Sequence, residues 1–161
     1  MPPVPVTIAV NGHPLSLALE PTRALLSVLR AEAGLTGTKE GCDDCECGAC
    51  MVLLDGRPVN ACSYLAVQCD GHAVTTVEGL GHPQRLGVLQ QAFLDAGGVQ
   101  CGFCTPGMLV SATALLDANP QPGEAEVREA LAGNLCRCTG YQRIVDGVLA
   151  AAGTATEAAA R

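Results

Sequence analysis

The sequence predicts an α+β protein of two successive domains, a small β-sheet domain followed by a helical bundle. Three observations support this division. Residues 4–80 are rich in β-branched residues and turn pairs and contain a single helical stretch. From Leu86 onward, apolar residues recur at helical spacing in four segments. Between these regions lies GHPQ (Gly81–Gln84), a Gly-Pro stretch typical of a boundary, so we expect domains at 1–81 and 82–161.

The first domain is expected to form a small sheet with one helix packed across it. The turn signal Asn11–Pro14 separates two β-rich segments, and Asp55–Gly56 separates two more, so each predicts a hairpin. The helix has closely spaced leucines and a closing Gly34. The expected elements are strands at Val4–Val10 and Leu15–Leu19, a helix at Thr22–Ala33, two strands within Met51–Cys62 and a strand within His72–Leu80.

The second domain contains an internal repeat. Each unit has a helix ending in Gly, then two cysteines separated by one or two residues, then Thr and a new helix. We expect Thr105 and Thr139 at N-cap positions and Pro106 at the first helical position. Two such units packed about a pseudo-twofold axis would gather four cysteines beside two helix N-termini, where thiolate is favoured. The four expected helices are Leu86–Gly98, Pro106–Pro120, Gly123–Asn134 and Gly140–Gly153.

Composition and charge exclude several classes of function. The formal charge is −7, and there is a single lysine, so a nucleic-acid partner is not expected. The N-terminal segment lacks a basic and apolar leader, and no stretch is long and apolar enough to cross a membrane. We therefore expect a cytoplasmic protein, in which ten cysteines favour metal thiolates over disulfides.

The first group of cysteines has a diagnostic spacing. Cys42, Cys47, Cys50 and Cys62 follow C-x4-C-x2-C with a more distant fourth, the plant-type ferredoxin pattern for a [2Fe–2S] cluster. Glycines in the loop, such as Gly41 and Gly48, would let backbone N–H groups reach the cluster sulfurs. Zinc is the alternative, because Cys47 and Cys50 form a C-x2-C pair, but zinc gives no reason for the x4 spacing.

The second group is ambiguous on spacing alone. Cys101, Cys104, Cys136 and Cys138 form C-x2-C and C-x-C pairs that suit either zinc or an iron–sulfur cluster. Cys69 fits neither group, and we expect it to be a small buried hydrophobe.

Four motifs carry a resemblance to a known family. LTGTKEGC, ECGAC, QCGFCTPGM and AGNLCRCTGY resemble the small iron–sulfur subunits of the molybdenum hydroxylases, the xanthine oxidase family. Similar chains include those of carbon monoxide dehydrogenase, 4-hydroxybenzoyl-CoA reductase and bacterial aldehyde or N-heteroaromatic dehydrogenases. The resemblance covers roughly Val6 to Val148 and implies a β-grasp, ferredoxin-like domain followed by a helical domain of the four-helix-bundle type.

The resemblance also implies a role for each cysteine group. Cys42, Cys47, Cys50 and Cys62 would ligate a distal [2Fe–2S] cluster nearer FAD. Cys101, Cys104, Cys136 and Cys138 would ligate a proximal cluster facing the molybdopterin cofactor. Gln100 matches the glutamine that hydrogen-bonds the pterin, and Cys138 would lie on the electron path from pterin to cluster. Large molybdopterin-binding and medium FAD-binding partner subunits are implied, in a dimer of heterotrimers.

One residue departs from the family pattern. The family usually has Gly at the position of Cys45, where a Cβ disfavours some backbone conformations. Cys45 is an additional ligand, a redox-active thiol or a bystander pointing away, and we favour the bystander. The nearby acids, Glu40, Asp43, Asp44 and Glu46, are expected to form a solvated rim, with docking to a basic partner surface as a hypothesis.

No catalytic constellation stands out. The histidines lie in turn-like contexts, and no phosphate-binding glycine motif is present. We therefore expect an electron-transfer subunit of a multi-subunit molybdenum-dependent oxidoreductase, with the substrate pocket on another chain. The alternatives are a free-standing two-cluster ferredoxin and a zinc-stapled protein-binding module.

Overall fold

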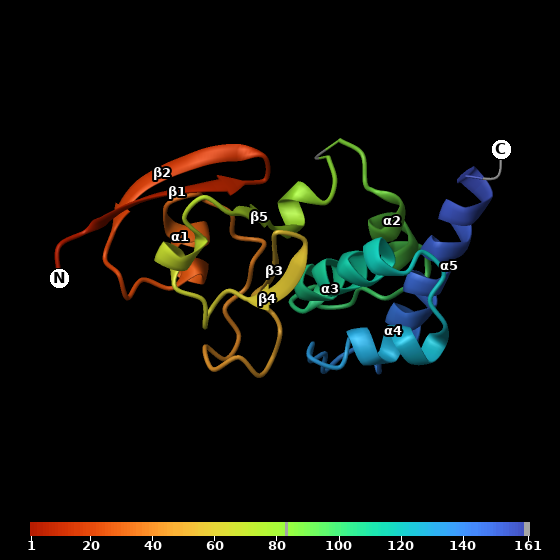
Figure 1. Cartoon of the computed structure of the whole chain (residues 1–161). Helices are drawn as coiled ribbons and strands as arrows, with labels where there is room; N and C mark the ends of the chain where they lie inside the picture. Colours follow the sequence, from red (N-terminus) through yellow and green to blue (C-terminus); the bar gives the residue numbers. More distant parts are fainter. Residues whose placement is uncertain (83, 160–161) are drawn as a thin grey trace.

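The computed structural model describes residues 1–82 and 84–159. A five-stranded sheet with one helix forms the N-terminal part, and α-helices form the C-terminal part (Figure 1). The α+β fold class is confirmed. The strands are β1 (Val4–Val10), β2 (His13–Leu19), β3 (Met51–Leu54), β4 (Arg57–Asn60) and β5 (Ala73–Thr75); the α-helices are α1 (Leu25–Ala31), α2 (Val88–Asp95), α3 (Thr105–Ala118), α4 (Glu124–Ala130) and α5 (Gln142–Ala159); the 3₁₀ helices are η1 (Ala66–Cys69) and η2 (Val77–Gly79).

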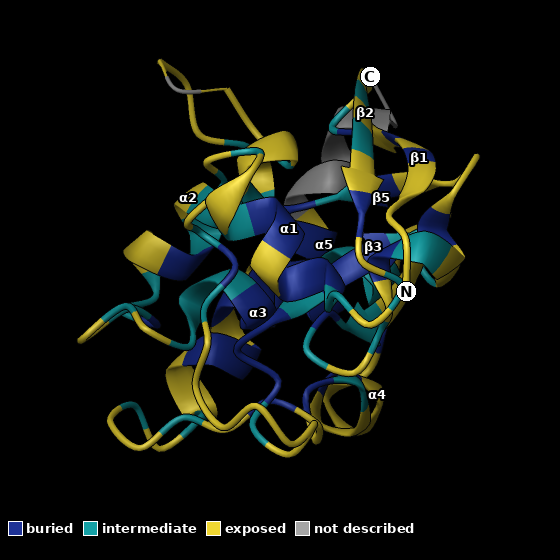
Figure 2. Cartoon of the chain, turned by 90° about the vertical axis from the view of Figure 1, so that its left-hand side faces the viewer, coloured by how far each residue is buried: buried dark blue, intermediate teal, exposed yellow. Residues whose placement is uncertain are grey.

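The sheet is mixed, with strand order β2-β1-β5-β3-β4. Both expected hairpins are present, and the β1–β2 register pairs Val4 with Leu19. Strand β5 lies between the hairpins, parallel to β1 and antiparallel to β3. Alternate residues of β1 are buried, as expected for a strand with one covered face, and they pack in one core with the leucines of α1. Figure 2 shows the buried face of α1 in dark blue.

Two elements of the sheet domain are shorter than the sequence predicts. The helix begins at Leu25 rather than Thr22, because Ala24 is extended and forms a β-bridge with Leu65. The strand expected over 72–80 ends at Thr75. The next residue, Thr76, is buried and hydrogen-bonded to the Asn11 side chain, and the chain then turns into η2. Long-range contacts therefore override the local β-propensity.

The four expected helices of the second domain are α2 to α5. Their core contains Phe93, Met108, Val127, Ile144 and Val148, all nearly inaccessible to solvent. Helix α5 continues through the alanine-rich stretch to Ala159. Among the described residues, no helix combines the length and apolar character needed to cross a membrane.

The predicted helix caps are wrong. Thr105 is the first residue of α3, Cys104 is its N-cap, and Pro106 is therefore the second helical residue. Thr139 is not the N-cap of α5, because the helix begins only at Gln142. The Thr139 Oγ1 accepts a hydrogen bond from the Tyr141 N–H at 3.2 Å. Each threonine directly follows a cysteine of the second group. The position of the cysteine pair, rather than the threonine, therefore determines how each helix begins.

Each domain has its own hydrophobic core. The first core runs from Val6 to Val74, and the second from Phe93 to Val148. Val77 and Leu80 pack against the second core although they precede the predicted boundary at residue 81, which stays a prediction. Helix α3 also packs against β3, so the two domains share a contact surface.

Candidate metal centres

The first cysteine group lies on an irregular loop between α1 and β3 and on the end of β4. Cys50 immediately precedes β3 and is buried, whereas Cys62 follows β4. The loop turns sharply through Asp43 and Cys45, which both have positive φ angles of 58° and 68°. This loop lies below β3 and β4 in Figure 1. Cys42 neighbours Cys47, and Cys50 neighbours Cys62 and interacts electrostatically with Cys47.

Backbone N–H groups point at these sulfurs. The Cys47 N–H donates to Cys42 Sγ at 3.4 Å, and the Ala49 N–H donates to Cys47. Burial raises the pKa of Cys62 to about 12, and the Cys50 thiol adds to the rise, although the Cys45 N–H opposes it. The Cys62 thiol therefore resists ionisation unless a cation compensates its charge.

The second cysteine group is brought together by the two helical repeats. Cys101 and Cys104 precede α3, and Cys136 and Cys138 precede α5. Cys104 neighbours Cys136, Cys101 neighbours Cys138, and the two pairs also interact electrostatically with each other. The first of these pairs is half-buried and the second is exposed. The group therefore has an inner pair against the helical core and an outer pair at the surface.

Two side chains that the sequence analysis did not assign to the site support Cys136. The Thr139 Oγ1 lies 3.0 Å from Cys136 Sγ, and the Tyr141 hydroxyl accepts a hydrogen bond from the Cys136 N–H at 2.8 Å. Burial raises the pKa of Cys136, but hydrogen bonds from Thr139 and the Cys138 N–H outweigh it and lower the pKa overall. The sequence signal that could have identified Thr139 and Tyr141 is the CTGY motif, in which both residues closely follow the cysteine pair.

Both groups fit a [2Fe–2S] cluster. Four cysteine thiolates hold the two irons, so two sulfur pairs with N–H groups aimed at them provide the right donors. Among the described residues, no set of three or more His, Cys, Asp or Glu side chains is arranged around one point as a single metal ion requires. All ten cysteines are free thiols in the structure, and the eight expected ligands are all in the two groups.

The two remaining cysteines differ. Cys69 is fully buried in the first core, which confirms the expected small hydrophobe. Cys45 does not point away from the first group, because its Sγ lies 3.9 Å from Cys62 Sγ. Its carbonyl accepts a hydrogen bond from Asn60 at 3.1 Å, which holds the loop in its left-handed turn. No local signal in the sequence distinguished this orientation from the expected one.

The surface around the second group carries exposed apolar side chains beside the exposed Arg137. Phe103 and Leu135 are 47% and 57% exposed, and Gln100 is exposed next to Cys101. Large exposed side chains beside exposed cysteines are typical of a surface that a partner covers.

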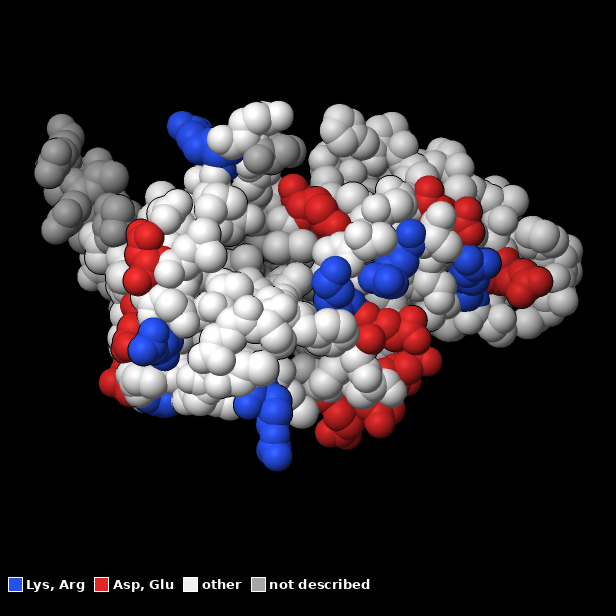
Figure 3. Space-filling view, turned by 180° about the vertical axis from the view of Figure 1, so that it is seen from behind, with Lys and Arg blue, Asp and Glu red and all other residues white. Residues whose placement is uncertain are grey.

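The surface around the first group is acidic. Figure 3 shows a dense group of Asp and Glu side chains on the face below the sheet domain. The four loop acids, Glu40, Asp43, Asp44 and Glu46, are all exposed, which fits the expected rim. Among the described residues, Lys39 forms no ion pair with these acids, and its Nζ donates to the Thr36 carbonyl at 2.7 Å.

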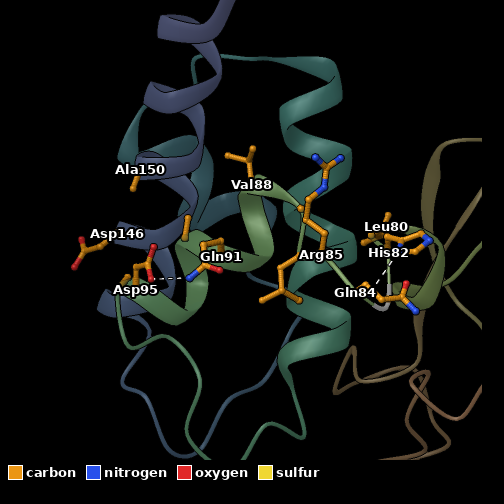
Figure 4. Close-up of a pocket in the computed structure, with 14 residues that line it drawn as sticks. Leu80, His82, Gln84, Arg85, Val88, Gln91, Asp95, Asp146 and Ala150 are labelled. Atoms are coloured by element: carbon orange, nitrogen blue, oxygen red, sulfur yellow. Dashed lines mark hydrogen bonds between the residues drawn. The ribbon is translucent and has the colours of Figure 1, made fainter.

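A wide groove of about 1330 Å³ lies away from both cysteine groups. It runs between the interdomain segment and helices α2 and α5, with Arg85 and Asp95 among its lining residues (Figure 4). The Asp95 carboxylate accepts a hydrogen bond from Gln91 at 2.8 Å. No cysteine lines this groove, so it is separate from the metal centres.

Comparison with known proteins agrees with this geometry. Residues 76–149 match the model of a [2Fe–2S] binding domain family. The nicotinate dehydrogenase small FeS subunit of Eubacterium barkeri is 49% identical over 141 residues, covering 88% of this chain and 90% of the relative. The nicotine 6-hydroxylase small subunit of Paenarthrobacter nicotinovorans is 50% identical over 150 residues, covering 93% and 90%.

Solved structures extend the likeness to the whole fold. A chain of quinoline 2-oxidoreductase from Pseudomonas putida 86 has a TM-score of 0.91 at 44% identity, covering 96% of this chain and 97% of that one. Aldehyde oxidoreductase from Desulfovibrio gigas has a TM-score of 0.92 at 44% identity, covering 96% of this chain but 17% of that one. This chain therefore belongs to the family of small [2Fe–2S] electron-transfer subunits of the molybdenum hydroxylases.

Proposed function

We propose that this chain holds two [2Fe–2S] clusters and carries electrons from a molybdopterin centre on one partner subunit to FAD on another. The observation that carries the proposal is the gathering of eight cysteines into two groups of neighbouring thiols. A bound [2Fe–2S] cluster supplies one-electron redox chemistry. The protein supplies thiolate ligands, N–H donors and partial exclusion of water.

The ligands of the distal cluster would be Cys42, Cys47, Cys50 and Cys62, and those of the proximal cluster Cys101, Cys104, Cys136 and Cys138. The outer pair of the second group supports the direction of transfer, because Cys101 and Cys138 are exposed and Gln100 stands beside them. In this proposal the Gln100 amide binds the pterin, and Cys138 is the ligand closest to it. The acidic first group would then face the FAD-binding subunit.

The partners would be a large molybdopterin-binding subunit and a medium FAD-binding subunit, assembled as a dimer of heterotrimers. The relatives support separate subunits, since those covered almost entirely are named as small subunits. In the aldehyde oxidoreductase of Megalodesulfovibrio gigas the matching region is only 16% of a longer protein, so there the module is joined to additional sequence. We place the complex in the cytoplasm, where free thiols persist.

Two other functions receive less support. A zinc-stapled module gives no reason for the C-x4-C-x2-C spacing, and residues 76–149 match a [2Fe–2S] binding domain family. A free-standing ferredoxin would not need the exposed apolar residues around the second group, which suit a covering partner.

The test is metal and spectroscopic analysis of the complex prepared anaerobically. We expect about four irons and four acid-labile sulfides per small subunit, together with two distinct low-temperature EPR signals after reduction. Zinc without sulfide, or a colourless iron-free complex, would contradict the proposal.

A variant separates the two clusters. Cys138→Ser should perturb the proximal signal and stop reduction by substrate, while dithionite still produces the distal signal. Cys69→Ser is the matched control, because Cys69 belongs to neither group, and both signals should persist. An unchanged pair of signals in Cys138→Ser would overturn the assignment of that ligand.

A further inference from the structure

The two cysteine groups are joined by a short junction of hydrogen bonds between the domains. Cys47, a member of the first group, has a carbonyl that accepts a hydrogen bond from the Leu135 N–H at 2.9 Å. Leu135 directly precedes Cys136, a member of the second group. One hydrogen bond therefore completes an otherwise covalent connection from the Cys47 side chain to the Cys136 side chain.

The residue before Leu135 reinforces this connection with its side chain. Asn134 Nδ2 donates to the Gly48 carbonyl at 3.0 Å, so two consecutive carbonyls of the first loop accept from two consecutive residues of the second. The Ser111 hydroxyl of α3 donates to Asn134 Oδ1 at 2.7 Å and fixes the orientation of the amide. Asn134 and Ser111 are 2% and 4% exposed, and a buried amide with both ends bonded has a single favourable orientation.

The backbone at the junction is packed without spare room. A Cβ on Gly48 would lie 2.3 Å from the Gly133 carbonyl, and a Cβ on Gly107 would lie 2.2 Å from the Gly48 carbonyl. Gly48 also has a φ angle of +67°, which favours glycine. The two loops can therefore approach this closely only because Gly48 and Gly107, beside the Asn134 amide, have no side chain.

We propose that Asn134 is a positioning residue that fixes the first cysteine loop against Cys136, so that electrons pass between the two groups through the Cys47–Leu135 hydrogen bond. This inference rests on the proposed two-cluster function. Asn134 touches no sulfur ligand through its side chain. It acts by keeping the carbonyl of Cys47 within reach of the Leu135 N–H, and electron tunnelling decays less along such a bonded route than across a gap.

Removal of the side chain should leave the fold intact. The Gly48 carbonyl also accepts a hydrogen bond from the Met51 N–H at 3.2 Å, so it keeps a partner in Asn134→Ala. Only the Ser111 hydroxyl loses its partner. The variant therefore loosens the junction without leaving an orphaned backbone group.

The experiment uses the complete complex with Asn134→Ala, compared with wild type and Asn119→Ala. Asn119 is the matched control, because its amide bonds Glu126 at the end of α3, away from the junction. Three quantities are measured: iron and sulfide content, the magnetic interaction between the two EPR signals in the fully reduced complex, and the rate of electron transfer between the clusters after rapid partial reduction.

We expect Asn134→Ala to retain iron, sulfide and both signals, with a weaker magnetic interaction and a several-fold slower transfer. Ser111→Ala should change both quantities in the same direction by less, because the Asn134 amide loses the Ser111 hydrogen bond but keeps the one to Gly48. Asn119→Ala should match wild type.

Two outcomes overturn the inference. An unchanged interaction and rate in Asn134→Ala would show that the junction does not depend on the amide. Loss of iron from either group would make Asn134 a structural residue of that site. Failure of the proposed function looks different, because the wild-type complex itself would then lack two signals.

Discussion

The two cysteine groups reach similar sulfur pairings by different structural means. The first depends on one irregular loop with left-handed turns at Asp43, Cys45 and Gly48. The second depends on two helical repeats that meet in a shared core. The first group is therefore sensitive to backbone conformation within the loop, and the second to helix packing at a distance from the sulfurs.

The surroundings of the two groups also differ in charge and in the source of hydrogen bonds. Backbone N–H groups and an acidic rim surround the first group. The second group has the Thr139 hydroxyl at Cys136 in addition to backbone N–H donors, and its exposed neighbours include Phe103 and Leu135. Because charge and hydrogen bonds to sulfur set the potential of an iron–sulfur cluster, the two sites should have different potentials.

The largest effect should come from breaking one group while sparing the other. Cys104→Ala removes a sulfur from the inner pair of the second group, so the helical domain should lose its cluster and much of its stability. The first group should keep its metal, because its ligands come from a separate domain. The measurement is iron content and EPR of the purified complex.

The control for this variant is Cys69→Ala, which also removes a cysteine sulfur but from the first core. It should retain all iron and reduce the free energy of unfolding by about 1 kcal/mol, as small core truncations do. Loss of both signals in Cys104→Ala would mean that the two domains do not hold their clusters independently.

The next effect tests the surface that joins the two groups. Gly107→Ala would place a Cβ 2.2 Å from the Gly48 carbonyl, so α3 and the first loop must separate. We expect the free energy of unfolding to fall by about 1–3 kcal/mol, the range typical of overpacking. Gly133→Ala, where a Cβ meets nothing within 4 Å, should change stability by less than about 0.5 kcal/mol. Equal effects in chemical denaturation would contradict the steric explanation.

The sequence predicted the parts of the fold that depend on local signals. Both hairpins follow turn pairs at Asn11–Gly12 and Asp55–Gly56, and all four C-terminal helices follow apolar periodicity. The first cysteine group was assigned by spacing alone. The second needed the family resemblance, since its spacing also suits zinc.

The junction and the sheet order could not be predicted, because they depend on residues far apart in sequence. Nothing local to Asn134 indicates a hydrogen bond to Gly48, and the pairing of β5 with both β1 and β3 has no short-range signal. The predicted caps at Thr105 and Thr139 were wrong because the backbone beside each threonine positions a neighbouring cysteine, which shifts the start of each helix.

A smaller effect should distinguish the electrostatics of the two groups. Neutralising the loop acids with Glu40→Gln, Asp43→Asn, Asp44→Asn and Glu46→Gln removes negative charge near the first group. The reduction potential of that cluster should rise, because negative charge disfavours the added electron, and the second should stay unchanged. Potentiometric titration followed by EPR measures both. The difference from wild type should shrink at high salt, and a shift confined to the second cluster would refute the argument.

The next prediction concerns the backbone conformation of the loop that carries the first group. Cys45 has a φ angle of 68°, where a Cβ is strained, so Cys45→Gly should stabilise the protein by about 1 kcal/mol. If Cys45 is a bystander, the iron content and the distal signal stay unchanged. The measurement is thermal unfolding alongside iron analysis. Loss of iron would instead identify the Cys45 sulfur, which lies 3.9 Å from Cys62 Sγ, as a ligand.

The smallest effect lies at the hairpin turn of the sheet domain, away from both groups. The Ala73 N–H, and secondly His72, hold the pKa of Asp55 below its ordinary value of 3.8. A lowered pKa in the folded state means that the ionised carboxylate stabilises the fold above about pH 4, and that this contribution disappears as the pH falls through the folded pKa. Asp55→Asn should therefore lower the thermal midpoint slightly at neutral pH, with wild type and variant converging below pH 4. Neither cluster signal should change, since this turn touches no cysteine ligand, and a difference in midpoint that persists at low pH would show that the effect is not one of charge.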